Sequence, residues 1–210
     1  MQNKSITELA ELYTGQGIWV RFYVRARARL LNIHRYPELL PHNGLIIDIG
    51  CGYGVLANYL SLHLPKNQIL GIDLNFKRID SANMSTNNRK NITFRIEDAS
   101  NSALPDCEGI VMTDFLHHVR PPDQQKILEN AFRSLRKGGV LLISEADPGA
   151  KPFYRYWASY LSDRVLYPLS KSYFRKSSDW ENTLSRLGFK VGVVKLRNPI
   201  FAGILFTCRK

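Results

Sequence analysis

The stretch from Leu45 to Gly54 reads LIIDIGCGYG and decides the fold of this chain. Its first half is an apolar run around one acid, Asp48, which predicts a buried parallel strand ending at Ile49. Its second half has glycine at every second position, where the backbone can contact a ligand because no Cβ intervenes. Helix-length apolar spacing follows Gly54. A strand, a glycine-rich turn and a helix in this order are typical of a nucleotide site in an α/β sheet.

The spacing of the glycines distinguishes two kinds of nucleotide site. The dinucleotide fingerprint is G-x-G-x-x-G, whereas this chain has Gly50, Gly52 and Gly54, so the third glycine comes early. Asp48 stands two residues before the first glycine. The resulting D-x-G-x-G-x-G pattern resembles the first motif of the class I S-adenosylmethionine (SAM)-dependent methyltransferases. A tight strand–helix turn without a ligand is the alternative, so the interpretation depends on the residues that follow.

Composition limits the class of protein. A chain of 210 residues accommodates one domain with a full core. The three cysteines lack metal-ligand spacing, so we expect no disulfide framework and no metal. Glu8 and Glu11 interrupt any signal-like apolar region and no run approaches the roughly 20 residues of a membrane span, so we expect a cytoplasmic protein. The net charge of +11 indicates an anionic partner: nucleic acid, a membrane surface, an acidic carrier protein or a phosphorylated substrate.

Residues 1–44 are predicted to form an N-terminal helical cap, with helices at 6–13 and 18–34. In the second helix, Arg21, Arg25 and Arg29 share one face, and Arg27 lies beside them. The alternating pattern there is also compatible with a strand. The basic face is either a solvated face of a helix that lies on the domain, or a cationic lip or interfacial helix. Apolar residues at spacings of three and four form a separate stripe: Trp19, Phe22, Tyr23, Ala26, Leu30 and Ile33.

Two acids follow the next two predicted strands. Asp73 lies near the end of a strand at 69–74, where its carboxylate can accept two hydrogen bonds from a ribose diol. A helix cap is the alternative for Asp73. Asp98 follows a strand at 92–96, where it can accept a hydrogen bond from an adenine amine, or simply serve as a turn residue.

The rest of the chain continues the alternation of strands and helices. Lys137-Gly138-Gly139 is predicted to stop a helix, and Ser178 with Glu181 forms a potential capping box. Asn198-Pro199 is expected to join the last two strands. The predicted elements are a strand from 109, a helix at 121–136, a strand at 140–144, a helix at 178–187, and strands at 189–196 and 204–208.

Together these motifs resemble the class I SAM-dependent methyltransferases, over about residues 40–210 and in the family's order. The resemblance implies an α/β, Rossmann-like fold: a seven-stranded sheet ordered 3-2-1-4-5-7-6, with the last strand antiparallel and helices on both faces. It implies a methyltransferase domain at 45–210. The segment from Glu108 to His118 is similar to that of small-molecule methyltransferases. It lacks the Asn/Asp-Pro-Pro-Tyr/Phe signature of many enzymes that methylate nucleobases, so a nucleic-acid substrate is less expected.

The resemblance also implies SAM as the cofactor and a set of residues around it. Because methyl transfer from a sulfonium uses an already activated donor, such an enzyme mainly positions and desolvates the acceptor. His118 and Asp114 are the candidates for a catalytic base, with structural packing at the start of a helix as the alternative. The implied cofactor residues are Asp48, Gly50, Cys51, Gly52 and Gly54 near the methionine end, Asp73 at the ribose, Asp98 at the adenine edge, Leu74 and Ala99 on the faces of the adenine, and Thr113.

Residues 149–176 are rich in both aromatic and basic residues, and they stand where this family often has a substrate lid. The aromatic residues suit a hydrophobic acceptor and the cations suit an anionic one, such as a chain on an acidic carrier protein or in an anionic membrane. A lid packed on the core with solvated cations is the alternative. We therefore expect a SAM-dependent methyltransferase for a small or lipid-like acceptor, O- or C-directed, cytoplasmic and peripheral to the membrane if the acceptor is a lipid. The alternatives are an RNA methyltransferase and a non-catalytic SAM-binding partner protein.

Overall fold

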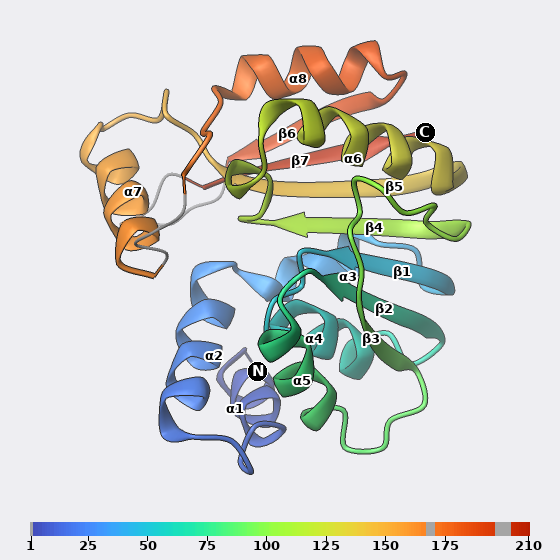
Figure 1. Ribbon diagram of the computed structural model, residues 1–210, viewed down its shortest axis with the longest axis vertical. Coiled ribbons are helices and arrows are strands. Elements are labelled where there is room, and N and C mark those ends of the chain that lie inside the picture. Colours follow the sequence, from blue (N-terminus) through green and yellow to red (C-terminus); the bar gives the residue numbers. More distant parts are fainter. Residues whose placement is uncertain (1, 167–170, 196–202) are drawn as a thin grey trace.

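The computed structural model describes residues 2–166, 171–195 and 203–210. Its centre is a seven-stranded sheet with the order β3-β2-β1-β4-β5-β7-β6 (Figure 1). Strand β7 is antiparallel to both β5 and β6, while the other pairs are parallel. The predicted fold class and strand order are therefore confirmed. The strands are β1 (Gly44–Ile49), β2 (Asn67–Asp73), β3 (Ile92–Ile96), β4 (Cys107–Thr113), β5 (Leu135–Ala146), β6 (Lys190–Lys195) and β7 (Gly203–Arg209).

Helices cover both faces of the sheet. Successive side chains of a strand point to opposite faces, so neighbouring apolar residues contribute to two separate cores. Ile46 packs into one core cluster with α1, α2, α4 and α5, and its neighbour Ile47 packs into a second cluster with α6 and α8. None of the described helices combines the length and apolar character needed to cross a membrane. The helices are α1 (Gln2–Glu11), α2 (Ile18–Leu30), α3 (Tyr36–Leu39), α4 (Val55–His63), α5 (Phe76–Met84), α6 (Pro121–Ser134), α7 (Tyr154–Leu166) and α8 (Ser177–Arg186), with short 3₁₀ turns η1 (Ile33–Arg35) and η2 (Leu116–His118).

The N-terminal helices share the core of the domain. Leu9 of α1 and Val24 of α2 are fully buried in the cluster that also contains α4. The hydroxyl of the buried Tyr13 donates to the backbone oxygen of Tyr53, at 2.8 Å, and accepts from Asn58 Nδ2. These bonds tie the segment after α1 to the glycine-rich turn and to α4.

The orientation of α2 differs from what its apolar stripe suggests. Val24 and Ala28 face the core, whereas Trp19 and Phe22 face solvent. The helix ends at Leu30, and η1 and α3 follow it. Pro37 lies in the first turn of α3, where its missing N–H is tolerated. The predicted helix was therefore too long, and the stripe with Trp19 is not the face that packs.

Two local signals in the second half of the chain predict helix ends that differ from those of the structure. Helix α8 begins at Ser177, with Lys176 in the N-cap position, so Ser178 does not form the predicted capping box. A carboxylate oxygen of Asp147 accepts from the Ser177 N–H instead, at 3.3 Å. Gly138 and Gly139 lie inside β5 and exchange backbone hydrogen bonds with Lys210, because α6 already ends at Ser134. The predicted junction Asn198-Pro199 lies outside the described residues.

Candidate functional site

The glycine-rich turn lies at the carboxyl ends of β1 and β2, where parallel strands expose a crevice. Gly50 has φ +72° and a Cβ there would lie 2.2 Å from the Phe115 ring. At Gly52 a Cβ would meet nothing closer than the Arg78 side chain, at 3.9 Å, so this part of the turn is open to a ligand. Gly54 has φ +73° and precedes α4, where a Cβ would lie 2.5 Å from Phe94.

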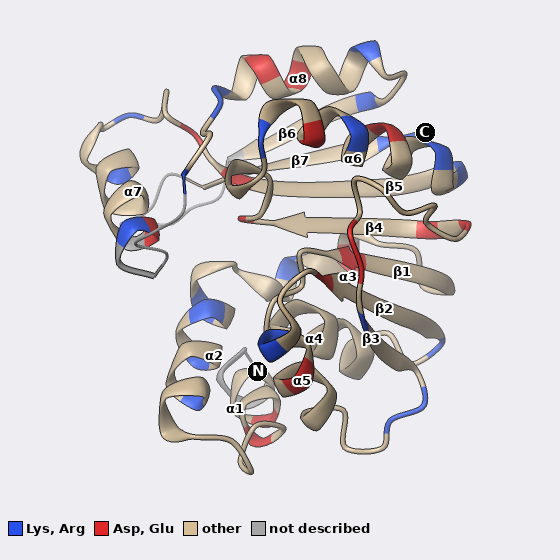
Figure 2. Cartoon of the chain, viewed as in Figure 1, with Lys and Arg blue, Asp and Glu red and all other residues tan. Residues whose placement is uncertain are grey.

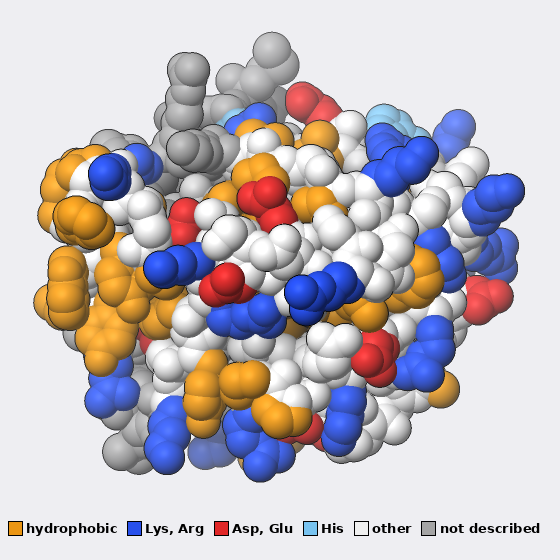
Figure 3. Space-filling view, turned by 90° about the horizontal axis from the view of Figure 1, so that it is seen from above, with side chains coloured by type: hydrophobic (Ala, Val, Ile, Leu, Met, Phe, Trp, Pro, Cys, Tyr) orange, Lys and Arg blue, Asp and Glu red, His pale blue; other side chains and the backbone are white. Residues whose placement is uncertain are grey.

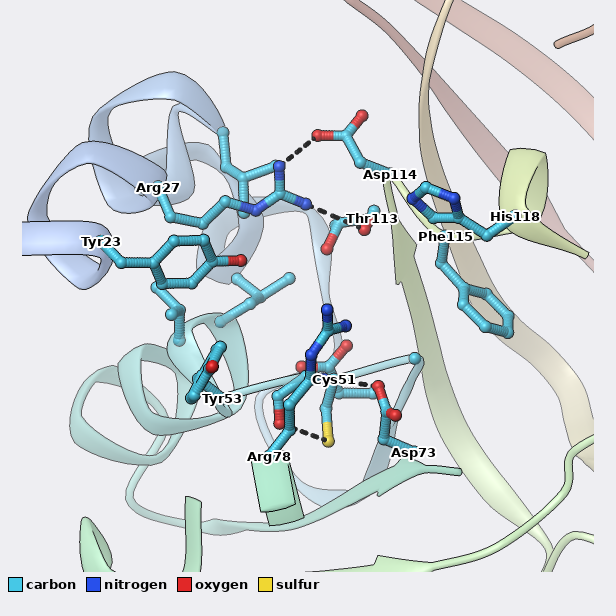
Figure 4. A pocket seen from close by; sticks show the side chains of 16 residues that line it. Tyr23, Arg27, Cys51, Tyr53, Asp73, Arg78, Thr113, Asp114, Phe115 and His118 are labelled. Carbon is cyan, nitrogen blue, oxygen red and sulfur yellow. Dashed lines mark hydrogen bonds and ion pairs between the residues drawn. The ribbon is translucent and has the colours of Figure 1, made fainter. Parts of the chain in front are cut away.

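A pocket opens over this turn, and eight of the predicted site residues line it together. Side chains from β1, β2, β4, α2 and α5 meet there (Figure 4). Gly54 is not among the lining residues and acts in the packing of α4 on the sheet. The pocket-lining residues that the sequence predicted are Asp48, Gly50, Cys51, Gly52, Asp73, Thr113, Asp114 and His118.

Two acids of the pocket differ in their surroundings. Asp48 is 1% exposed, and its Oδ1 has no hydrogen-bond partner among the described residues. Burial raises the pKa of Asp48 to about 7, helped by the nearby charge of Asp73. Asp73 is less buried, and its Oδ2 accepts from the Gly52 N–H at 2.9 Å. Asp48 is therefore a buried acid with an unmatched acceptor, and Asp73 is already part of the turn.

Helix α2 supplies pocket residues that the sequence analysis did not assign to the site. Tyr23 and Arg27 of α2, and Leu31 just after it, line the pocket, and Figure 4 shows Arg27 reaching across to the end of β4. Its Nη1 lies 2.8 Å from Asp114 Oδ2, and its Nη2 donates to the Thr113 backbone oxygen at 3.3 Å. Arg27 was grouped with a basic surface, because nothing in the local sequence separates it from its arginine neighbours.

Three predicted adenine-contacting residues lie outside the lining of this pocket. Leu74 follows Asp73 and is 67% exposed. Asp98 accepts hydrogen bonds from Ser100 and from Asn101. These hydrogen bonds, those from Ser100 foremost, lower the pKa of Asp98. Ala99 is buried under α6. Their role at an adenine stays a prediction.

Glu145, at the end of β5, organises the turn next to the pocket. Its Oε1 accepts from the backbone N–H groups of Phe115 and Leu116, and its Oε2 lies 2.5 Å from His117 Nδ1. Glu145 is 1% exposed. The carboxylate thus fixes both the backbone and the ring orientation at η2. No local pattern predicts this contact, because Glu145 lies far from η2 along the chain.

Asp163 connects α7 to the two histidines. Its Oδ1 lies 3.2 Å from His118 Nε2 and 3.5 Å from His117 Nε2. Burial opposes the charge of His117, but Glu145 and Asp163 outweigh it and raise the pKa of His117 to about 10. Burial and the charge of His117 lower the pKa of His118 to about 4. At neutral pH the cluster therefore holds one imidazolium and one neutral imidazole that borders the pocket.

The same cluster is the one group of His, Cys, Asp and Glu side chains, among the described residues, that could hold a metal ion. One ligand atom from each of His117, His118 and Asp163 lies within 4.8 Å of the others. The imidazolium of His117 already balances part of the negative charge of Asp163 and Glu145. The four side chains therefore form a network of ion pairs that connects α7 to η2.

Known proteins resemble this chain in sequence and in fold. Residues 47–143 match a family model described as "Methyltransferase domain". A carboxy-S-adenosyl-L-methionine synthase of Trichodesmium erythraeum is 28% identical over 146 residues, which cover 68% of this chain and 51% of that protein. A malonyl-[acyl-carrier protein] O-methyltransferase of Bacillus cereus is 30% identical over 103 residues, covering 47% and 36%. The solved magnesium protoporphyrin IX methyltransferase of Synechocystis, with bound SAH, has a TM-score of 0.68 at 17% identity, covering 95% of this chain and 92% of that one.

The solved structure's fold agrees with the sheet order. Residues 47–143 match the methyltransferase domain model, and the sheet has the strand order and fold of the solved methyltransferase. It spans about half the length of the curated relatives it matches. The matched region runs from β1 to β5 and includes the glycine-rich turn, Asp73 and η2.

Proposed function

We propose that this chain is a methyltransferase that transfers a methyl group from SAM to a small or lipid-like acceptor, at oxygen or carbon. The observation that carries the proposal is the pocket over the glycine-rich turn, with its buried, unmatched Asp48 Oδ1. SAM has an ammonium and a carboxylate on its methionine end and a diol on its ribose. An acid, a cation and open backbone are the groups that complement such a ligand.

Each of these groups has an assigned partner in the proposal. Asp48 would accept from the ammonium, and Arg27 with the open backbone at Gly52 would hold the carboxylate. Asp73 would accept from the ribose diol. SAM supplies an activated methyl group when bound, so the remaining work of the protein is to position the acceptor and exclude water.

His118 is the proposed general base for an acceptor hydroxyl or acidic carbon. It lines the pocket and is neutral at physiological pH, and Asp163 lies within reach of its Nε2. Neutral imidazole can take a proton, and a facing carboxylate stabilises the resulting charge. Asp114 is already paired with Arg27, so we assign it to the positioning of that arginine.

The acceptor is proposed to be hydrophobic because of the aromatic side chains that pack beside the histidine cluster, which reaches the pocket through His118. Tyr156 and Tyr160 of α7 pack around Phe174, whose ring stacks on His117 with centroids 4.5 Å apart. The three aromatic side chains are half-buried. They suit an apolar or aromatic acceptor, with an acidic carrier protein or an anionic membrane as its source.

The experiment is label transfer from methyl-labelled SAM to a host extract, followed by separation of lipid, small-molecule, protein and RNA fractions. We expect label in the lipid, small-molecule or carrier-protein fraction. Label in RNA would make the basic surface a substrate platform and would overturn the proposed acceptor class. No label in any fraction, together with SAM binding, would favour a non-catalytic SAM-binding partner.

A further inference from the structure

Helices α2 and α7 each present an apolar face that no other described element covers. On α2, Trp19 is 81% exposed and Phe22 is 68% exposed. On and just before α7, the exposed apolar side chains follow helical spacing, so they share one face. These are Phe153, Tyr154, Trp157 and Leu161. Large aromatic side chains are seldom this exposed in groups unless they contact a partner.

The apolar face of α2 is not a packing face that lost its partner. The helix already buries Val24 and Ala28 in the core, and it directs Tyr23 and Arg27 into the pocket. Trp19 and Phe22 therefore lie on a third face of α2, which is separate from the core face and the pocket face and is exposed to solvent. The helix binds the domain with one side and remains available with the other.

Basic residues flank both faces, and acids are absent from them. Arg25 and Arg29 are exposed on α2, whose sequence contains no acid (Figure 2). Helix α7 contains a single acid, Asp163, which is buried against the histidines. Lys151 is exposed just before α7. Tryptophan, other aromatics and arginine without exposed acids are the composition of helices that lie in the interface of an anionic bilayer.

The two helices lie on the same side of the molecule as the pocket. Figure 1 shows both on the left, beyond the carboxyl ends of the strands, and Figure 3 shows hydrophobic side chains with Lys and Arg beside them at the edge where α7 lies. Helix α2 reaches the pocket through Arg27, and α7 reaches it through Asp163 and His118. A surface that bound both helices would therefore face the entrance of the site.

We infer that α2 and α7 dock this protein onto an anionic lipid bilayer, so that the pocket opens toward the membrane. Trp19, Phe22, Trp157 and Leu161 enter the headgroup region, while Arg25 and Arg29 meet anionic headgroups. An acceptor then reaches His118 from the lipid phase. This last step rests on the proposed methyl transfer, but the docking itself does not.

The three tryptophans of the chain provide a direct readout. Trp19 and Trp157 are exposed, whereas Trp180 is 1% exposed and serves as an internal reference. The purified chain is mixed with vesicles of phosphatidylcholine alone or with about one third phosphatidylglycerol, including brominated lipids that quench nearby tryptophan. No SAM or acceptor is added, so the result does not depend on methyl transfer. Variants that retain only one exposed tryptophan assign the quenching.

We expect the chain to float with the anionic vesicles at least about tenfold more strongly than with the neutral ones, and less so at high salt. Trp19 and Trp157 should be quenched and Trp180 should not. The variant Arg25→Glu/Arg29→Glu should lose binding. Its matched control is Lys90→Glu/Lys137→Glu, which makes the same charge change at exposed positions near the opposite ends of the strands and should bind normally.

Substitution of the apolar faces separates docking from general basicity. Trp19→Gln/Phe22→Gln should lose binding, while Met84→Gln, which changes an exposed apolar side chain of α5, should not. Equal losses in Arg25→Glu/Arg29→Glu and in its control would overturn the inference, because overall charge would then explain binding. Equal losses in Trp19→Gln/Phe22→Gln and in Met84→Gln would overturn it too, because binding would then not depend on the apolar face of α2. Absence of flotation, or quenching confined to Trp180, would overturn it as well. Binding to an acidic carrier protein in place of vesicles would reassign the surface.

Discussion

The two halves of the site are built in different ways. The half over β1 and β2 consists of backbone and short side chains at the ends of neighbouring strands. The half toward α7 consists of long side chains from α2, η2, β5 and α7, which meet only in the folded chain. The first half is thus held by the sheet itself, and the second by contacts between distant segments. Under the proposed function, the sheet-built half binds the methyl donor and the attached helices select the acceptor.

The largest expected effect is on the sheet-built half. Gly50→Ala would force a side chain into a left-handed backbone position and against the Phe115 ring, so it should lower the free energy of unfolding by about 3 kcal/mol. The control is Gly138→Ala, at φ +82° with no neighbouring atom within 4 Å, which should lose only about 1 kcal/mol. Denaturant unfolding measures both. Equal losses would mean that the turn is not restricted by packing.

The next effect concerns catalysis in the helix-built half. If His118 is the base, His118→Ala should lower kcat by at least about 100-fold at saturating acceptor and leave SAM affinity unchanged. His42→Ala, at an exposed histidine, is the control. The substrate found by label transfer serves for the assay. Near-full turnover of His118→Ala would remove the base assignment.

A third variant tests whether α2 belongs to the donor site as well as to the acceptor side. Arg27→Ala should weaken SAM binding by about 10- to 100-fold, because a charged hydrogen bond to the carboxylate is lost. Arg25→Ala, two residues away on the exposed face, should bind SAM normally. If both variants bind SAM like the wild type, α2 only covers the pocket. The donor would then be bound by the sheet-built half alone.

The smallest effect is a pH dependence in the donor half. Burial raises the pKa of Asp48 to about 7, so below that pH the acid is protonated in the free protein and must lose its proton to pair with an ammonium. SAM affinity should therefore fall by about tenfold per pH unit below pH 7 and level off above it. Asp48→Asn should bind more weakly and without this slope. An unchanged slope in the variant would assign the titration to another group.

The sequence predicted several lining residues of the sheet-built half because its signals are local. The glycine spacing and Asp48 occupy one short segment, and Asp73 follows at the end of the next strand, where topology brings it to the same edge. The strand order followed from the same resemblance. Local periodicity could not show which face of α2 packs, since Trp19 and Val24 are equally apolar in the pattern.

The helix-built half was largely missed for a physical reason. Glu145 and Asp163 meet His117 from two separate elements, and Arg27 meets Asp114 across most of the N-terminal half of the chain. Such pairs leave no periodic trace in the sequence. The capping box failed in the same way, because the distant Asp147 binds the start of α8 in place of Ser178.

Calorimetric titration of SAM, and separately of NADH, into the purified chain tests whether the pocket over the glycine-rich turn is a SAM site. We expect one SAM site of micromolar affinity and no binding of NADH. Asp73→Ala should weaken SAM binding by about 1–3 kcal/mol, because a buried ribose hydroxyl loses its acceptor. Absence of SAM binding, or binding of NADH at the same site, would contradict the account. Unchanged SAM affinity in Asp73→Ala would contradict the assignment of the ribose.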